Sequence, residues 1–122
     1  VKHTQVNSAP TPDEAEALRG LAAAFQDAAL ALDLIAKKQE IKGQSDPLPE
    51  ADFTNGEFLQ SVAVSVGTVQ GYGILREWFK VLYEVLLGTS QGPRIGSFAK
   101  LYGLENTVAL LEKGAAGDLV QS

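Results

Sequence analysis

Apolar residues recur three or four positions apart through most of this sequence, and glycines separate the segments that show this spacing. The spacing places the apolar side chains on one stripe of an α-helix. Glycine is common at helix ends because it adopts the left-handed backbone conformation at little cost. The pattern predicts an all-α fold, a bundle of about five helices of which the first is long. The predicted helices cover residues 11–41, 54–70, 74–87, 93–102 and 104–113.

The first of these helices has the clearest start signal. Thr11 is placed to cap it, Pro12 suits the first helical position, and Glu14 can accept a hydrogen bond from the N–H of the capping residue. Its apolar stripe consists of Leu18, Leu21, Phe25, Ala28, Leu32 and Ile35. Gly43 is expected to end it, and two prolines within residues 43–54 predict a loop before the next helix.

A second capping-box pattern, from Thr54 to Glu57, opens the one segment in which a strand competes with a helix. Val62, Val64 and Val66 alternate as strand residues would, and valine favours strands. Because no second segment could pair with such a strand, a helix is predicted here as well.

The chain has 122 residues, which corresponds to one domain. The polar, unpatterned residues 1–10 are expected to form a flexible tail or linker, residues 11–114 the helical domain, and residues 115–122 a C-terminal tail. The sequence contains no methionine, so residue 1 is interpreted as either a processed end or a cut inside a longer protein.

Composition excludes several kinds of site chemistry. There is no cysteine, and the only histidine, His3, lies in the polar N-terminal stretch. Thiolate nucleophiles, Ser-His-Asp catalysis and zinc sites built on histidine or cysteine therefore lack their residues. Clustered carboxylates such as Asp13 and Glu14 are interpreted as ordinary residues of a helix start. No catalytic residue and no metal site is predicted.

The formal net charge of −5 argues against a general nucleic-acid binder held by charge alone, although it leaves a specific one open. No apolar run approaches the ~20 residues that span a membrane, and no secretory leader precedes the helices. A cytoplasmic protein without a membrane partner is therefore expected, and the absence of cysteine suits a reducing compartment.

The acidic excess is confined to residues 1–70, which carry five basic and ten acidic residues, whereas residues 71–122 carry five of each. Within the second half, Arg76 and Lys80 share a helix face, and Lys100 lies further along the chain. A phosphate backbone would be contacted in this half. A solvated helix surface explains the same pattern.

The glycine-rich segment 88–97 places Arg94 and free backbone N–H groups at the start of a predicted helix, which would suit an anion. The alternative is a tight joint in which glycine ends one helix, Pro93 starts the next, and Arg94 caps a helix end. Tyr83 and Tyr102 lie at the edges of apolar stripes, where they are available to stack on bases. Trp78, Phe79 and Phe98 are expected in the core.

Residues 75–114 resemble the C-terminal end of class I lysyl-tRNA synthetases. The elements that carry the resemblance are WF-x-x-LYEVLLG at 78–88, GPR-x-GSF at 92–98 and LYG-x-E-x-T-x-x-LL at 101–111. The upstream capped helix and the VSVG segment at 64–67 are compatible with it. Glutamyl-tRNA synthetases are similar in having a helical C-terminal domain with a glycine-proline joint.

The resemblance implies that this chain is the anticodon-side helical domain, sometimes described as an α-helix cage. In such enzymes a separate Rossmann-type domain joins lysine to tRNA with ATP, through HIGH-like and KMSKS-like motifs that these 122 residues lack. The chain is then expected to hold no cofactor, to catalyse nothing alone, and to bind the tRNA anticodon stem-loop beside the catalytic domain of the same protein. The tRNA-binding residues expected from charge and placement are Arg94, Arg76, Lys80, Lys100 and Tyr102.

Two other interpretations stay open. One is an anticodon domain of the glutamyl-tRNA synthetase kind, and the other is a helical module that packs an apolar groove against a partner protein. Such a module predicts association that is insensitive to salt and shows no preference among tRNAs. A self-standing enzyme comes third, because cysteine is absent and the one histidine lies near the N-terminus.

Overall fold

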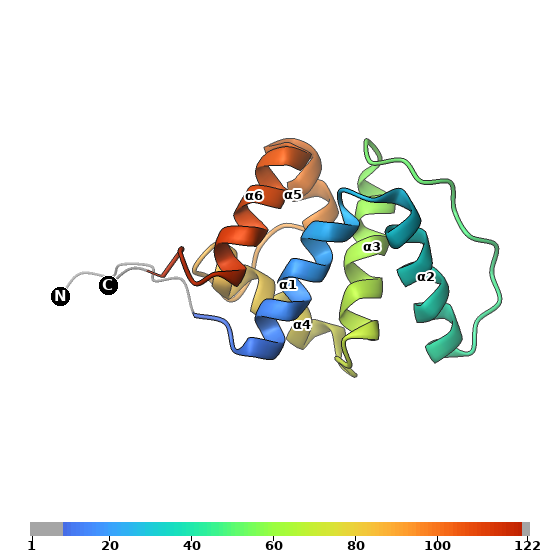
Figure 1. Ribbon diagram of the computed structural model, residues 1–122, viewed down its shortest axis with the longest axis horizontal. Coiled ribbons are helices and arrows are strands. Elements are labelled where there is room, and N and C mark those ends of the chain that lie inside the picture. The colour runs from blue at the N-terminus through green and yellow to red at the C-terminus, as the bar shows by residue number, and fades with distance from the viewer. Residues whose placement is uncertain (1–8, 121–122) are drawn as a thin grey trace.

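The computed structural model describes residues 9–120, and within this range the chain is a bundle of α-helices without a strand (Figure 1). The helices are α1 (Pro12–Ala24), α2 (Ala28–Lys42), α3 (Gly56–Val69), α4 (Leu75–Leu86), α5 (Ile95–Tyr102) and α6 (Leu104–Ala115). The predicted all-α bundle is confirmed, and the valine-rich segment is helix α3. The tail or linker expected at residues 1–10 lies almost wholly outside the described residues.

The prediction of one long first helix is wrong, because this segment forms α1 and α2, and the described residues therefore form six helices rather than about five. The helix is interrupted at residues 25–27, where Asp27 has an extended backbone (φ −143°, ψ 105°). Its side chain accepts hydrogen bonds from the N–H groups of Ala29 (3.0 Å) and Leu30 (3.3 Å). First-turn N–H groups have no partner inside their own helix, so an aspartate at this place stabilises a new helix start.

The break changes which residues of the predicted stripe face inward. Phe25, next to the break, is buried, whereas Ala28 at the start of α2 is exposed. Ala31 and Ile35 are the buried residues of α2. In Figure 1, α3 lies between α1 and α2, and both helices contact it. The redirected α2 thus covers a side of α3 that a straight continuation of α1 would leave open.

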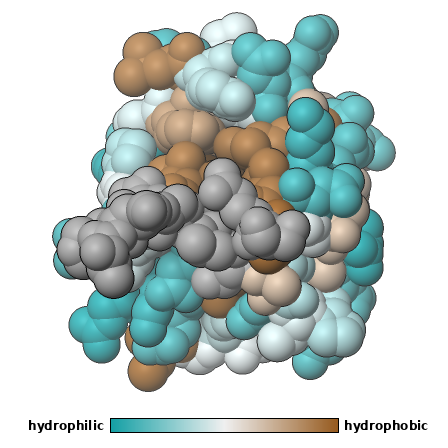
Figure 2. All heavy atoms as spheres, turned by 90° about the vertical axis from the view of Figure 1, so that its left-hand side faces the viewer, coloured by the Kyte–Doolittle hydropathy of each residue, from teal (hydrophilic) through white to brown (hydrophobic). Residues whose placement is uncertain are grey.

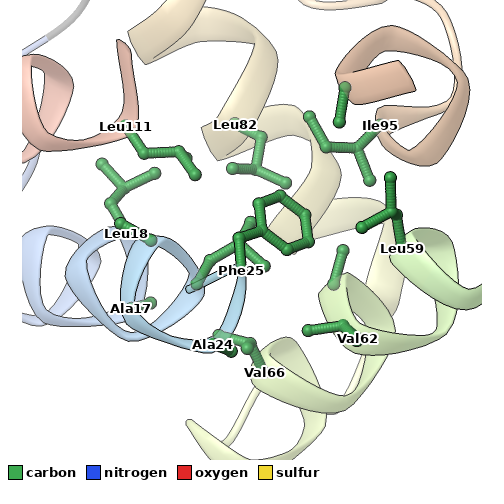
Figure 3. Packing of buried hydrophobic residues seen from close by; sticks show 14 of the residues in the cluster. Ala17, Leu18, Ala24, Phe25, Leu59, Val62, Val66, Leu82, Ile95 and Leu111 are labelled. Carbon is green, nitrogen blue, oxygen red and sulfur yellow. The ribbon is translucent and has the colours of Figure 1, made fainter. Parts of the chain in front are cut away.

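The hydrophobic core lies where α1, α3, α4, α5 and α6 meet (Figure 3). The ring of Phe25 points into its middle, toward Leu82 and Leu59. The largest fully buried side chains include Trp78, Phe25, Leu18, Leu21, Leu59, Leu82, Ile95 and Leu111. Removing such apolar surface from water is the main favourable term in folding. This core holds α4 and α5, the two helices that carry or adjoin the predicted binding residues.

α3 starts later than the sequence pattern predicts. Asn55 caps it, with Oδ1 accepting from the N–H of Glu57 at 2.8 Å. Thr54, the predicted cap, instead donates its hydroxyl to Oδ1 of Asp52 at 2.6 Å. Threonine and asparagine are both good capping residues. Because Asp52 binds the threonine hydroxyl, the asparagine takes the capping position.

α5 also differs from the prediction. The predicted helix begins at Pro93, whereas α5 begins at Ile95, and Arg94 is the residue directly before it. Leu101, an apolar residue of this helix, is 88% exposed. The buried face of this short helix carries Ile95 and Ala99. A residue two positions beyond Ala99 lies about 200° further round the helix, so Leu101 faces solvent.

α6 continues to Ala115 and leads into a turn at residues 116–119. Ala115 is buried, and Leu119 packs against the core in a partly buried position. These residues fall within the expected C-terminal tail, 115–122, whose boundary stays a prediction. Within the part of the chain that the structure describes, no helix is long and apolar enough to cross a membrane.

Candidate nucleic-acid interface

The indole ring of Trp78 fixes α4 against α3. The ring is fully buried, and its Nε1–H donates to the backbone oxygen of Ala63 at 2.9 Å. Gly67 makes room for the ring, because a Cβ atom there would lie only 2.8 Å from Trp78 Cγ. The VSVG and WF sequence elements therefore meet in one contact, which sets the position of α4.

Tyr83 holds the segment that joins α4 to α5. Its hydroxyl donates to the backbone oxygen of Pro93 at 2.6 Å. The backbone of Gly92 lies against its ring, since a Cβ atom at Gly92 would be 2.9 Å from Tyr83 Cδ1. Burial raises the pKa of the Tyr83 hydroxyl above its usual value, which already leaves a tyrosine protonated at neutral pH, so the group is available as a donor. The tyrosine predicted to be available for stacking thus has its hydroxyl engaged in the joint.

α5 approaches α3 closely at a pair of glycines. The N–H of Gly96 donates to Oε1 of Gln60 at 2.9 Å. A Cβ atom at Gly96 would overlap with the backbone oxygen of Gly56 and lie 2.8 Å from the backbone nitrogen of Gln60. Only a residue without a side chain fits such an approach. These contacts make the GPR-x-GSF element a tight joint between helices.

A surface hollow of about 630 Å³ lies beside this joint, and we name it the α4 hollow. Its lining consists of Arg76, Glu77, Phe79, Lys80, Tyr83, Ser90, Gln91 and Gly92. Two of the five predicted tRNA-binding residues, Arg76 and Lys80, are thus brought together, one helical turn apart and both exposed. The hollow combines cations, aromatic rings and polar loop side chains, which are the groups that RNA loops use as partners.

Several residues of the α4 hollow were not predicted as site residues. Phe79 was assigned to the core, yet it is only partly buried. The sequence could have predicted its place on this surface, because positions 76, 79, 80 and 83 have the spacing of one helix face. Ser90 and Gln91 carried no such signal, since only the turn after α4 brings them to this face.

Arg94 lies beside carboxylates instead. Its Nη2 atom is 3.5 Å from Oε1 of Glu57. Glu57, Asp52 and Glu50 line a second hollow, of about 460 Å³, at the start of α3. Among the described residues, no group of three or more acidic or histidine side chains is placed to hold a metal ion. The arginine that was predicted to bind tRNA or to cap a helix therefore forms an exposed ion pair across the joint.

The charge of Lys100 affects Asp52, one of the carboxylates that line the second hollow. The pKa of the Asp52 carboxyl lies below its usual value, chiefly because the hydroxyl and the N–H of Thr54 donate to it. The positive charge of Lys100 lowers this pKa further, as a smaller contribution. The charge of Lys100 therefore acts on Asp52 without an ion pair between the two in the described residues.

Tyr102 lies at the C-terminal end of α5. It is 47% exposed, and its ring stacks on Phe98 with centroids 5.0 Å apart and an interplanar angle of 20°. Neither Tyr102 nor the cations Arg94 and Lys100 line the α4 hollow. The structure therefore divides the five predicted residues into a pair on α4 and a group of three on or next to α5.

The chain is similar to the lysine–tRNA ligases of several organisms. It is 42% identical over 83 residues to that of Roseobacter denitrificans, 47% over 62 residues to that of Rickettsia felis, and 46% over 63 residues to that of Rickettsia prowazekii. These alignments cover 68%, 51% and 52% of this chain. No protein-family model matches the chain, and no solved structure matches it.

The chain spans only 14%, 12% and 12% of the length of these three curated relatives. The similarity is therefore to a small part of each of these relatives. The identity of at least 42% extends over half of this chain or more in each comparison. Over this length, the chain is homologous to part of the lysine–tRNA ligases, which are aminoacyl-tRNA synthetases.

Proposed function

We propose that this chain is the C-terminal tRNA anticodon-binding domain of a class I lysine–tRNA ligase. The observation that carries the proposal is its similarity to lysine–tRNA ligases. The resemblance of residues 75–114 to the C-terminal end of class I enzymes supports the class and the place in the chain. The whole protein would attach lysine to tRNA in the cytoplasm, using ATP in a separate catalytic domain. This chain would position the anticodon stem-loop and catalyse nothing itself.

The surface chemistry of α4 and α5 supports RNA as the partner. The proposed contact residues are Arg76, Lys80, Arg94, Lys100 and Tyr102. Proteins recognise RNA loops by stacking unpaired bases on aromatic or guanidinium planes and by hydrogen bonds to the base edges. α4 meets this requirement with Arg76 and Lys80 beside Phe79 in the α4 hollow, and α5 carries Lys100 and the half-exposed ring of Tyr102.

The net charge of −5 limits how tightly the chain alone binds RNA. Each phosphate contact releases counterions, so the logarithm of the affinity falls with the logarithm of salt concentration, with a slope of about −0.7 per contact on single strands. Because few cations are available, we expect weak binding by this chain and further phosphate contacts from the catalytic domain.

The test is a titration of this chain against fluorescently labelled lysine tRNA and against a copy with a substituted anticodon, at low and at moderate salt. We expect the unaltered tRNA to bind more tightly at both salt concentrations, because the anticodon bases are read directly. Salt should weaken both complexes, because the phosphate contacts are common to the two RNAs. Equal affinity for the two tRNAs would contradict an anticodon-reading role.

Glutamate tRNA serves as a third ligand in the same titration. If it binds more tightly than lysine tRNA, the glutamyl-like alternative replaces the lysine assignment. We therefore expect the chain to bind lysine tRNA most tightly and to bind glutamate tRNA no more tightly than the anticodon-substituted copy.

A module that binds a partner protein is the second candidate, and apolar surface favours it. Leu101 is 88% exposed. Figure 2 shows several hydrophobic atoms side by side above the grey atoms on the face at the left of Figure 1, with hydrophilic side chains around them. Contiguous apolar surface of this kind marks interaction sites. This candidate predicts that the chain binds a partner protein with an affinity that does not depend on salt. It also predicts equal affinities of the chain for all three tRNAs.

A further inference from the structure

The geometry points to the α4 hollow as the site of a single unstacked RNA nucleotide. Its phosphate would be held by Arg76 and Lys80, and its base would lie against Phe79 and Tyr83. The inference rests on the proposed RNA-binding function and names the place and the ligand chemistry within it. It also ranks the two groups of cations, because it assigns the main phosphate contact to α4 rather than to α5.

Charge distinguishes the two groups. Arg94 pairs with Glu57 at 3.5 Å, and Lys100 lies in the field of Asp52. Glu50 lines the same hollow as Glu57 and Asp52, so this hollow contains a third carboxylate. The α5 side therefore presents three carboxylates and two cations, a balance that disfavours an anion.

In the α4 hollow, cations outnumber carboxylates. Arg76 and Lys80 outnumber its single carboxylate, Glu77. Within the part of the chain that the structure describes, neither of these two cations forms an ion pair. Both side chains are exposed. They can therefore turn to a phosphate without breaking a contact.

The aromatic rings of the α4 hollow are positioned in advance. The Tyr83 hydroxyl is held by the Pro93 carbonyl at 2.6 Å, and the Gly92 backbone lies against the ring. Phe79 is partly buried on the same helix face. A ring that is already fixed loses little conformational freedom when a base stacks on it. Stacking of this kind accepts any base, because every base has a π-face.

The loop after α4 adds groups that can discriminate between bases. Ser90 and Gln91 are exposed at the edge of the α4 hollow. The hydroxyl of Thr89 donates to the backbone oxygen of Gln91 at 2.5 Å, which orders this loop. The Gln91 amide offers both donors and an acceptor to a base edge. The volume of about 630 Å³ is ample for one nucleotide with its water.

The experiment measures the affinity of this chain for the anticodon stem-loop of lysine tRNA at several salt concentrations. We expect Arg76→Gln and Lys80→Gln each to weaken binding about three- to tenfold and to reduce the salt slope by about 0.7, as for the loss of one phosphate contact. Phe79→Leu should weaken binding about threefold or more and leave the salt slope unchanged, because it removes a stacking surface and no charge. Arg94→Gln and Lys100→Gln should each have a smaller effect than either α4 variant.

Lys113→Gln is the matched control. It removes one positive charge from the last turn of α6, outside both hollows. We expect an affinity within twofold of the unaltered chain, which shows that net charge alone does not explain the α4 variants. Circular dichroism of every variant confirms that the helices remain formed.

Amide shifts in two-dimensional NMR spectra provide a second measurement, with the stem-loop added to the isotope-labelled chain. We expect the largest shifts at residues 76–92. Larger shifts along α5, or larger losses for Arg94→Gln and Lys100→Gln than for the α4 variants, would overturn the inference.

The inference and the proposed function can fail separately. If the chain prefers lysine tRNA but the α4 variants bind as well as the unaltered chain, the α4 hollow is excluded and the tRNA function stands. If the chain binds all tRNAs equally and the α4 variants still weaken binding, the α4 hollow stands as an RNA site and anticodon reading is excluded.

Discussion

Three glycines of this chain matter because of what lies next to them. Gly67, Gly92 and Gly96 face a neighbouring side chain or backbone so closely that a methyl group would overlap with it. None of the three has a positive φ, in contrast to Gly43 (69°) and Gly88 (72°) at helix ends. Sequence patterns identify the second kind as helix stops. The first kind is visible only in the structure, because the neighbour comes from a distant part of the chain.

Gly67→Ala is expected to destabilise the fold by about 1–3 kcal/mol, as overpacking of a core does. The new methyl group would collide with the indole of Trp78, which is fully buried and cannot move aside. Urea unfolding followed by circular dichroism measures the change. Gly73→Ala is the control, since nothing lies within 4 Å of a Cβ atom there, and its free energy of unfolding should change by at most about 0.5 kcal/mol. Equal effects of the two substitutions would contradict the close contact.

The break between α1 and α2 is the element on which the shape of the N-terminal half depends. Asp27→Ala should lower the free energy of unfolding by about 1 kcal/mol, because the first N–H groups of α2 lose their acceptor. Thermal unfolding followed by circular dichroism at 222 nm, the usual helix signal, provides the measurement. Asp46→Ala is the matched control, because Asp46 is exposed in the loop between α2 and α3. If both variants unfold at the same temperature, Asp27 does not hold the start of α2.

α4 shows how one helix serves both the core and the site. Its inner face carries the buried residues Trp78, Leu82, Val85 and Leu86. Its outer face carries Arg76 and Lys80 at the α4 hollow. The periodicity of the sequence was sufficient to predict both faces, because apolar and charged residues alternate with the helical repeat. It could not show that a loop from beyond the helix closes one side of the outer face.

At the scale of the whole molecule, the segment between α2 and α3 is the longest stretch without helix within the described residues, and it runs along the outside of the bundle (Figure 1). Residues 43–50 are all exposed. Limited digestion with proteinase K, followed by mass spectrometry, should therefore cut first within this segment. The segment between α4 and α5 is the internal control, because Tyr83 and Pro93 hold it to the bundle. First cleavage at residues 88–94 would contradict this order.

The fold class was predictable from the sequence, whereas the path of the chain was not. Helical spacing of apolar residues and the capping box at Thr11 reproduce the local structure, since a helix depends on residues within a few positions. The prediction failed at Asp27, where the apolar spacing continues across a break. Both α1 and α2 contact α3, and these contacts join segments that are distant in the sequence.

The same division holds for the candidate site. The sequence by itself determined that residues 71–122 contain as many cations as carboxylates and most of the aromatic residues, and that Arg76 and Lys80 share a helix face. Only the tertiary structure decided that Arg94 pairs with Glu57 of α3 and that the charge of Lys100 acts on Asp52 in the preceding loop, while the α4 pair forms no ion pair within the described residues. The physical reason is that charge compensation acts through space, between residues that the order of the chain does not bring together.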